Sequence, residues 1–564
     1  VFGKSLRYDT LVNDGVSNWQ KALSKFQKHE ATQSHKDSVV CWNSYKASLS
    51  QGNIVEQIEA ASATEVSERR EYLERIVAVT CFLGKQGISF RGHDETEESD
   101  NKGNFRECMT LLEKFDPFLQ RYTPPSNTTY ISCSSQNEMI ECCSQEVTAA
   151  IVHEIKESQM YAIMADEARD GRTEQLALCV RYVSVEGVVK ERFLALTEMP
   201  KFDAASINTA IENQLQEKGI ERLKCVAQTY DGAAVMSGTV GGVQAHFQKK
   251  HPEAIYVHCY AHELNLILCH TCRAVTETIE FFNMLESLHS FFSASLVNHH
   301  KFMDTQKKLG LEQSELAQLS NTRWTLKQKR SDATAIDLHA RTRAMCEANQ
   351  IAVLEQSSGQ RQKKKRMDGF VVESTCGAGS EVCGSSVSEE LKRKLLFPCL
   401  DRMISELEKR FSGISQELLN GIQACSPTSN HFLSEPHLSA LALHYHIELQ
   451  SEEVTVAKSF LKLKSEAGAI PDMSTMYNLL DNEIFPTLKT VIRVALTIPV
   501  SSCSCERSFS VLRRLHTWLR RTMGQSRLQH LAVMSVEKEM LERVDHQKVI
   551  DRFASLKVRR HTVG

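Results

Sequence analysis

The positions of apolar residues between 147 and 269 predict a sheet whose strands are interleaved with helices. Short apolar or alternating runs are typical of strands, and apolar residues repeating at helical spacing are typical of amphipathic helices. Glu186-Gly187 separates two alternating stretches, as a hairpin turn does. The predicted strands are 160–165, 176–183, 188–197, 225–230 and 255–259, and the predicted helices are 147–158, 204–218, 240–248 and 262–269.

The order of these elements indicates the fold class. The first three strands follow one another and are antiparallel, whereas the later strands are joined through helices and are parallel. Three antiparallel strands followed by parallel strands crossed over by helices match the ribonuclease H-like arrangement. We therefore predict an α/β fold of this class, accompanied by helical regions on both sides of it in the sequence.

The residues before the sheet are predicted to be mainly helical. Apolar residues at helical spacing predict a helix over 72–83 that ends at Gly84, and a further helix over 111–119. The polar, acidic stretch 91–100 predicts an exposed loop between them. The stretch 120–135 is rich in Pro, Ser, Thr and Asn, and we expect it to be a linker.

The residues after the sheet follow a helical pattern from Arg273 to about position 490. One interruption, 356–388, is rich in Ser, Gly and charged residues, which predicts a disordered or mobile loop. Within it, Lys363-Lys364-Lys365-Arg366 fits a nuclear address, a phosphate contact or a solvated run of charge.

Composition and charge restrict the function classes. The 564 residues are 41% hydrophobic and 24% charged, with a formal net charge of −3, so any nucleic-acid-binding surface has to be local. No apolar run is long enough to span a bilayer and no signal peptide is recognised, so we expect no membrane partner. The 18 cysteines show no disulfide-like spacing, which favours reduced thiols in an intracellular setting. Because the chain begins with Val1, we expect it to be a fragment.

Two aspartates come directly after predicted strands. Asp166 follows the strand 160–165, and Asp231 follows the strand 225–230. A carboxylate at the end of a buried strand is rigidly held yet reachable by solvent, which suits a metal ligand or a general base. For Asp231 the alternative is a cap of the helix that follows, because Asp is a good capping residue. The prediction of a site therefore depends on partner carboxylates.

A third carboxylate, Glu506, follows the predicted loop 499–505 and lies on the first turn of a late helix. The strands that end at Asp166 and Asp231 are neighbours in a ribonuclease H-like sheet, and the late helix can return to that sheet. Three such carboxylates can hold two Mg²⁺ ions about 3.5–4 Å apart, and Mg²⁺ prefers carboxylate oxygens. Spacing alone does not separate such a trio from chance, because Asp and Glu are common.

The late helix is amphipathic. Its apolar stripe offers a partner surface if it is exposed, and packs inside the chain if it is buried. Arg507 and several other arginines lie mostly off the stripe and form the basic stretch 507–527. The stripe consists of Phe509, Leu512, Leu515 and Leu519, and it continues through Leu528, Leu531 and Met534.

Two histidines near the N-terminus, His29 and His35, are spaced as half of a zinc site is. A structural zinc site needs four ligands, usually with a Cys pair, and no Cys pair precedes these residues. The alternatives are two histidines on a helix surface or the remnant of a truncated zinc finger. Zn²⁺ is expected here only if the missing Cys pair is supplied.

Several separate stretches carry a family resemblance, and they occur in the family's order. They are Met164-Ala165-Asp166-Glu167, Tyr230-Asp231-Gly232-Ala233-Ala234, His258-Cys259-Tyr260-Ala261-His262, Thr322-Arg323-Trp324 and Cys505-Glu506-Arg507-Ser508-Phe509-Ser510, with 90–94 and 103–105 in the N-terminal region. The chain resembles the hAT superfamily of cut-and-paste DNA transposases. More narrowly, it resembles the transposase-like proteins grouped with the zinc finger MYM-type family, in the zinc finger MYM-type / TTF-type finger subgroup.

The resemblance implies a ribonuclease H-like fold interrupted by a large all-helical insertion. It implies that Asp166, Asp231 and Glu506 correspond to the metal-binding catalytic triad, with Mg²⁺ (or Mn²⁺) as the cofactor, and that Cys259 and His262 lie beside that site. The implied domains are 1–40, a truncated zinc-finger remnant; 50–145, a helical N-terminal region with a linker; 146–270, the first part of the ribonuclease H-like fold; 271–490, the insertion; 491–545, the last part of the fold with the dimerisation region; and 546–564, a tail.

DNA is the implied partner, contacted by Arg323, Trp324 and Arg507, and the implied location is the nucleus. Trp324 would stack against an extruded base, as flat aromatic side chains do, although a tryptophan packed in the core is the alternative. The C-terminal region implies a homodimer or a higher homo-oligomer.

Three functions remain open from the sequence. The first is a transposase-derived nuclear protein that associates with DNA and dimerises without demonstrated catalysis. The second is an active Mg²⁺-dependent DNA transposase that cleaves and transfers strands. The third is a protein-interaction scaffold based on the C-terminal helix.

Overall fold

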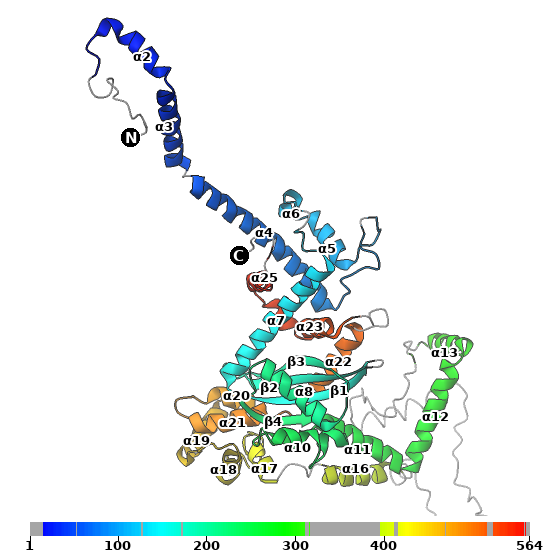
Figure 1. Cartoon of the computed structure of the whole chain (residues 1–564). Coiled ribbons are helices and arrows are strands. Elements are labelled where there is room, and N and C mark those ends of the chain that lie inside the picture. Colours follow the sequence, from blue (N-terminus) through cyan, green and yellow to red (C-terminus); the bar gives the residue numbers. More distant parts are fainter. Residues whose placement is uncertain are drawn as a thin grey trace, which may run out of the picture. The chain divides into compact units, whose positions relative to one another are not determined.

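The computed structural model describes residues 15–51, 54–96, 98–125, 128–170, 173–308, 310, 315, 395–410, 416–468, 470–515, 523–557 and 559. Figure 1 shows the helices and strands of the chain. By its internal contacts the chain divides into two compact units. The first unit contains Val1–His258 and Glu417–Gly564, and the second contains Cys259–Gln416. The predicted loop at 356–388, with its basic run, lies outside the described residues.

A five-stranded mixed sheet forms the centre of the first unit, in the order β3-β2-β1-β4-β5. The pairs β1–β2 and β2–β3 are antiparallel, and the pairs β1–β4 and β4–β5 are parallel. The predicted mixed α/β class and the predicted change of strand direction are therefore confirmed. The strands are β1 (Met160–Asp170), β2 (Thr173–Val183), β3 (Val189–Met199), β4 (Lys224–Tyr230) and β5 (Ile255–His258).

The hairpin between β2 and β3 turns where the sequence predicted it. Gly187 has φ 76°, a left-handed conformation that glycine adopts without a steric penalty. Its backbone N–H donates to the carbonyl oxygen of Ser184 at 2.9 Å, which closes the turn. A Cβ atom at Gly187 would meet the side chain of Asn478, so the position also requires glycine for space.

Helices cover the sheet because its strands are apolar on both faces. In β2 every residue from Leu176 to Arg181 except the last is buried, so neither face of this strand is solvated. The helices that pack on the sheet are α7 (Cys133–Ser158), α8 (Ala204–Glu217), α21 (Pro486–Thr497), α22 (Cys503–Leu515) and α23 (Gln525–Val536).

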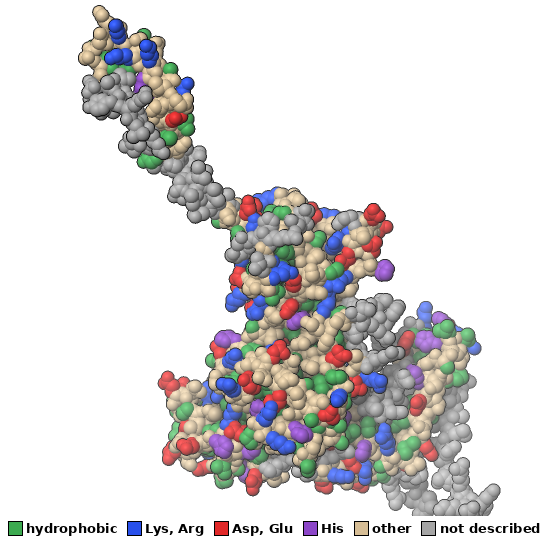
Figure 2. Space-filling model, viewed as in Figure 1, with side chains coloured by type: hydrophobic (Ala, Val, Ile, Leu, Met, Phe, Trp, Pro, Cys, Tyr) green, Lys and Arg blue, Asp and Glu red, His purple; other side chains and the backbone are tan. Residues whose placement is uncertain are grey.

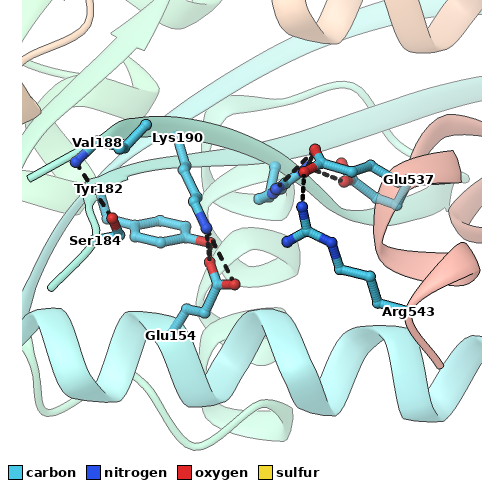
Figure 3. Close-up of polar contacts among 9 residues, drawn as sticks. Glu154, Tyr182, Ser184, Val188, Lys190, Glu537 and Arg543 are labelled. Atoms are coloured by element: carbon cyan, nitrogen blue, oxygen red, sulfur yellow. Dashed lines mark hydrogen bonds and ion pairs between the residues drawn. The ribbon is translucent and has the colours of Figure 1, made fainter. Parts of the chain in front are cut away.

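Polar side chains fix α7 and the end of α23 to the sheet (Figure 3). The Glu154 carboxylate on α7 accepts hydrogen bonds from the Tyr182 hydroxyl at 2.6 Å and from Lys190 Nζ at 3.1 Å. Glu537, directly after α23, accepts the backbone N–H of Phe193 on β3 at 2.6 Å. The contact of Glu537 with Phe193 joins segments that are 344 positions apart in the sequence.

The N-terminal helical region packs on the C-terminal helices, and it corrects one prediction. Helix α4 (Ile54–Gln86) does not end at Gly84, as expected, but runs through it. A Cβ atom at Gly84 would lie 2.5 Å from Cε of Met534 on α23. Glycine therefore stands in α4 because another helix packs closely against it, which a local pattern does not reveal.

Two further boundaries in this region differ from the predictions. The expected helix 111–119 is two helices, α5 (Asn104–Glu113) and α6 (Pro117–Arg121). Asp116 caps the second of them by accepting the backbone N–H of Phe118 at 2.8 Å, and Pro117 occupies its first position. The expected linker 120–135 is shorter than predicted, because Ser132 caps α7 and the helix begins at Cys133.

The remaining described elements of the first unit are helices. They are η1 (Trp19–Lys21), α2 (Ala22–Glu30), α3 (Gln33–Gln51), α9 (Ala234–Ser237), α10 (Val243–Gln248), α17 (Gln416–Ala424), α18 (Glu435–His444), α19 (Ser451–Ala467), α20 (Met473–Leu479), α24 (Lys538–Glu542) and α25 (His546–Ser555). One apolar core extends from α4 and α7 through the sheet to α22, α23 and α25.

The regular elements that the structure describes in the second unit are all helices. They are α11 (Tyr260–Ala274), α12 (Thr276–Ser293), α13 (Leu296–Lys308) and α16 (Phe397–Arg410). Over the described parts of both units, no helix combines the length and the apolar character needed to cross a bilayer.

Candidate functional site

Asp166, on β1, and Asp231, directly after β4, lie at equivalent positions in the register of these two neighbouring strands. The parallel pairing of β1 with β4 sets Met164 opposite Thr229. Asp166 and Asp231 each follow two residues later, so the register sets the two aspartates at equivalent positions on neighbouring segments. Asp231 comes directly after β4, as predicted, but the prediction that Asp166 follows its strand is wrong, because β1 continues to Asp170 and pairs Asp166 with Ala177 on β2. Asp166 is only 7% exposed, whereas Asp231, directly after β4, is partly exposed.

Asp231 does not cap the next helix, which settles the alternative left open by the sequence. The N-cap of α9 is Ala233, and it has no side-chain capping bond. The Asp231 carboxylate instead accepts the backbone N–H of Ala233 at 3.3 Å, within its own turn. The Tyr256 hydroxyl on β5 donates to the backbone carbonyl of Asp231 at 3.3 Å, which fixes the turn to the neighbouring strand.

Helix α22 returns to β1 beside Asp166. The Cys505 thiol donates to the backbone carbonyl of Met164 at 3.3 Å. Burial raises the pKa of this thiol, and neighbouring Cys179 and Asp166 raise it further. Glu506, the next residue, therefore lies on a first helical turn that is packed against the strand carrying Asp166. The expected return of the late helix to the sheet is what the structure shows.

Glu167 is a site residue that the sequence reasoning did not single out. Burial raises its pKa to about 7, and the charges of Asp231 and Glu174 add to this effect. A carboxyl group with a pKa near neutrality can both hold and release a proton at physiological pH. The available signal was the pair of adjacent acidic residues Asp166-Glu167, which follows the apolar part of β1.

The carboxylates do not form a metal site in the part of the chain that the structure describes. No group of three or more His, Cys, Asp or Glu side chains is arranged there to hold a metal ion. Asp166, Asp231 and Glu506 thus come from elements that are neighbours in the fold, but they do not constitute a ready donor set for Mg²⁺.

Of the three predicted DNA-contacting residues, the structure describes Arg507 alone. The Arg507 side chain is 70% exposed and lies 3.5 Å from the carboxylate of Glu191 and 2.6 Å from Oγ of Ser504. It is therefore at the surface and already held by polar groups. Arg323 and Trp324 lie outside the described residues.

A basic stripe on the N-terminal helices was not foreseen. On the face of the molecule drawn in Figure 2, Lys and Arg side chains are mixed with Asp and Glu over the body of the protein, but basic side chains gather on the N-terminal helices. Lys21, Lys25 and Lys28 are spaced so that they lie on one face of η1 and α2, and all three are exposed. We call these three residues the lysine stripe.

His29 and His35 are brought together at the corner between α2 and α3. Their ring centroids are 4.8 Å apart in an edge-to-face arrangement. Thr32 in the corner donates its hydroxyl to the carbonyl of His29 at 2.6 Å and accepts the backbone N–H of His35 at 3.2 Å. Two imidazoles fall short of the four ligands of a structural zinc site.

Cys259 and His262 belong to the second unit, whereas the carboxylates belong to the first. Cys259 is buried and precedes α11 as its N-cap, and His262 is partly exposed in the first turn of that helix. Their predicted place beside the carboxylates stays a prediction.

The C-terminal apolar stripe belongs to the protein core. All of its members that the structure describes are at most 5% exposed, and Leu519 lies outside the described residues. The described part of the stripe thus packs within the chain and offers no free surface to a partner. Its buried members are Phe509, Leu512, Leu515, Leu528, Leu531 and Met534.

Comparison with known proteins gives two family matches in different parts of the chain. Residues 9–242 match the RNase-like domain of ZMYM1/FAM200, and residues 477–540 match the hAT family C-terminal dimerisation region. The first match contains β1 to β4 with both aspartates, and the second contains α21 to α23 with Glu506.

Two curated relatives are similar over less than half of this chain. The human 52 kDa repressor of the inhibitor of the protein kinase is 26% identical over 245 residues, which is 41% of this chain and 31% of that protein. The mouse protein of the same name is 25% identical over 240 residues, with the same shares. The chain therefore matches about a third of the length of these relatives.

Proposed function

We propose that this chain is a transposase-derived nuclear protein that associates with DNA as a homodimer. The premise is that the chain is a hAT transposase-like protein of the ZMYM1/FAM200 type. The observation that carries this proposal is the pairing of an RNase-like domain with a hAT dimerisation region in one chain. In the structure, strands β1 to β4 of the mixed sheet lie in the RNase-like part, and α22 of the dimerisation region packs against β1 of that sheet. We further propose that the helical second unit is the insertion into the ribonuclease H-like fold.

Association with DNA is supported by local positive charge. The formal net charge of the chain is −3, so nonspecific attraction to phosphate has to come from a limited surface. The lysine stripe offers three exposed ammonium groups on one helical face, and Arg507 offers a guanidinium group near the carboxylates.

The experiment is a titration of labelled duplex DNA with the protein at several salt concentrations. We expect binding whose association constant falls steeply with salt, because each lysine–phosphate contact releases a counterion. Absence of binding at low ionic strength would reject the DNA-associated function.

Dimerisation is supported by the family match at 477–540 and needs a surface other than the buried stripe. Within that range the exposed large apolar side chains include Leu479, Ile484 and Val500. Ile484, at 61% exposure, lies between α20 and α21, where a second copy of the chain can cover it. Size-exclusion chromatography with light scattering should show a dimer for the unmodified chain and a shift toward monomer for Ile484→Glu. An unchanged mass for the variant would exclude this surface.

Catalytic competence is the second candidate function. It is favoured by the equivalent register positions of Asp166 on β1 and Asp231 directly after β4. Bound Mg²⁺ would supply Lewis-acid activation of a water nucleophile and stabilise the leaving oxygen. The described carboxylates do not form a donor set for that ion, so no cleavage step follows from them. Burial raises the pKa of Glu167, and the charges of Asp231 and Glu174 raise it further.

Calorimetry with Mg²⁺ or Mn²⁺ tests this candidate. If the carboxylates converge in solution, Asp231→Asn abolishes binding, whereas Asp401→Asn, an exposed control on α16, leaves it unchanged. Lack of binding in the unmodified chain would leave the protein as a DNA-associated, non-cleaving homodimer. The scaffold function loses its support, because the stripe on which it rested is buried.

A further inference from the structure

Two cysteine thiols from different helices meet where the N-terminal helical region packs on the body of the first unit. Cys81 lies on α4 and Cys143 lies on α7, and their Sγ atoms are 3.8 Å apart. Cys81 is partly exposed, whereas Cys143 is fully buried. The two thiols are thus in contact, and one of them is accessible to a small solute.

A histidine completes the cluster from a third helix. His546, the first residue of α25, lies close enough to the Cys81 thiol to affect its titration. The hydrogen bond with Cys143 lowers the pKa of Cys81 to about 6, and the interaction with His546 acts in the same direction against the effect of burial. The interaction with Cys81 raises the pKa of His546, to which Glu74 and Asp545 also contribute.

The two thiols of the cluster therefore differ in how readily they lose their protons. Because the pKa of Cys143 is raised by its hydrogen bond with Cys81 and by burial, the buried sulfur keeps its proton while Cys81 becomes the thiolate. The neighbouring thiol of Cys142 differs from that of Cys81, because burial raises the pKa of Cys142 to about 12. The thiolate is the nucleophilic form of cysteine, so Cys81 is the reactive member.

We propose that Cys81 and Cys143 are a redox modification site, at which a peroxide converts the two thiols into a reversible intramolecular disulfide. The two sulfur atoms would have to approach from 3.8 Å to about 2.05 Å. The bond would join α4 to α7, and α7 ends two residues before β1. It would thereby fasten the N-terminal helical region to the central sheet.

The chemistry balances with hydrogen peroxide as the oxidant. The Cys81 thiolate attacks one peroxide oxygen, the O–O bond breaks, and the departing hydroxide takes a proton to leave as water. The resulting Cys81 sulfenic acid is attacked by the Cys143 sulfur. The S–S bond forms as the S–O bond breaks, and the proton of Cys143 leaves with the hydroxide as a second water. Two thiols are oxidised by two electrons, and one peroxide is reduced to two waters.

Peptide mapping after peroxide treatment tests the proposal on the full chain. We expect a disulfide-linked pair of peptides that contain Cys81 and Cys143, and its loss after treatment with dithiothreitol. Cys143→Ser should instead leave a Cys81 sulfenic acid that dimedone traps, because the resolving thiol is gone. Cys142→Ser is the matched control, and it should form the linked pair as the unmodified chain does.

A second measurement keeps both thiols and does not depend on a folded cysteine variant. The rate of Cys81 alkylation against pH should have its midpoint near 6, and His546→Asn should move that midpoint toward the ordinary thiol value of about 8.5. The proposal is overturned if peroxide yields linked peptides equally from all neighbouring cysteines, if no Cys81–Cys143 pair forms, or if His546→Asn leaves the midpoint unchanged.

Discussion

The thiol of Cys505 donates a hydrogen bond to the backbone carbonyl of Met164 across 3.3 Å, and this contact joins α22 to β1. Cys505 immediately precedes Glu506, and Met164 comes two residues before Asp166. The contact therefore holds the third candidate carboxylate next to the strand that carries the first. It also joins the two parts of the chain that match different family models.

Replacing Cys505 by alanine should lower the free energy of unfolding by about 1–2 kcal/mol, because a fully buried sulfur atom and its hydrogen bond are both lost. Cys503→Ala is the control, since Cys503 is partly exposed two residues earlier and should cost less than about 0.5 kcal/mol. Chemical denaturation measures both values. Equal losses in the two variants would show that the Cys505–Met164 contact contributes nothing specific.

Gly84→Val should destabilise the protein by about 2–3 kcal/mol, since the added side chain would collide with buried Met534 on α23. Ala78→Val on the exposed side of the same helix controls for the effect of a β-branched residue, and should cost about 0.5 kcal/mol. Urea denaturation of the two variants separates the packing effect from helix propensity. A Gly84→Val variant as stable as its control would mean that α4 and α23 do not pack closely at this position.

Glu167→Gln should change the pH dependence of stability. The pKa of Glu167 is raised from 4.5 to about 7 by burial and by the charges of Asp231 and Glu174, so the folded state binds this proton more tightly than the unfolded state. Between these values the unmodified chain loses stability as pH rises, and the glutamine variant does not.

At pH 8 the Glu167→Gln variant should be more stable than the unmodified chain by about 1–2 kcal/mol, once solvent screening of this partly exposed group is allowed for. At pH 4 the two proteins should be equally stable. Glu186→Gln, in the exposed hairpin turn, should follow the unmodified chain at every pH. Parallel curves for all three proteins would refute the assigned environment of Glu167.

Replacing the three residues of the lysine stripe by glutamine should weaken DNA binding and reduce its dependence on salt. Three lost phosphate contacts lower the slope of log K against log salt by up to about 2.7. The control replaces Lys458, Lys462 and Lys464, which are exposed on α19, and removes the same charge. If both triple variants lose the same part of the slope, the effect is one of net charge, and the lysine stripe is not the DNA-contacting surface.

The sheet was predictable because burial imposes a local pattern on strands. Alternating and apolar runs identify β1 to β5, and Glu186-Gly187 carries the signature of its turn in two residues. Gly84 was misjudged because its neighbour Met534 is 450 positions away in the sequence, and no local pattern records that contact. The break at Asp116-Pro117 was a local signal, a capping residue followed by proline, which the apolar spacing of 111–119 concealed.

The sequence was enough to predict which elements carry the candidate site residues. It was not enough to predict how folding shifts the pKa values of the residues there. The ends of apolar runs in the sequence indicate Asp166 and Asp231, although β1 continues through Asp166 to Asp170. The raised pKa of Glu167 follows from burial and from charges brought near it by folding. Equally, the sequence shows the amphipathic stripe from Phe509 onward, and only the packed structure shows that the stripe faces the core.

The mass of the protein–DNA complex tests the central claim most directly. Sedimentation of the chain with a short labelled duplex reports both association with DNA and the number of chains bound. A DNA-associated homodimer predicts a complex of two chains per duplex whose population falls as salt is raised. A single chain per duplex, or no complex at low salt, would contradict the proposal.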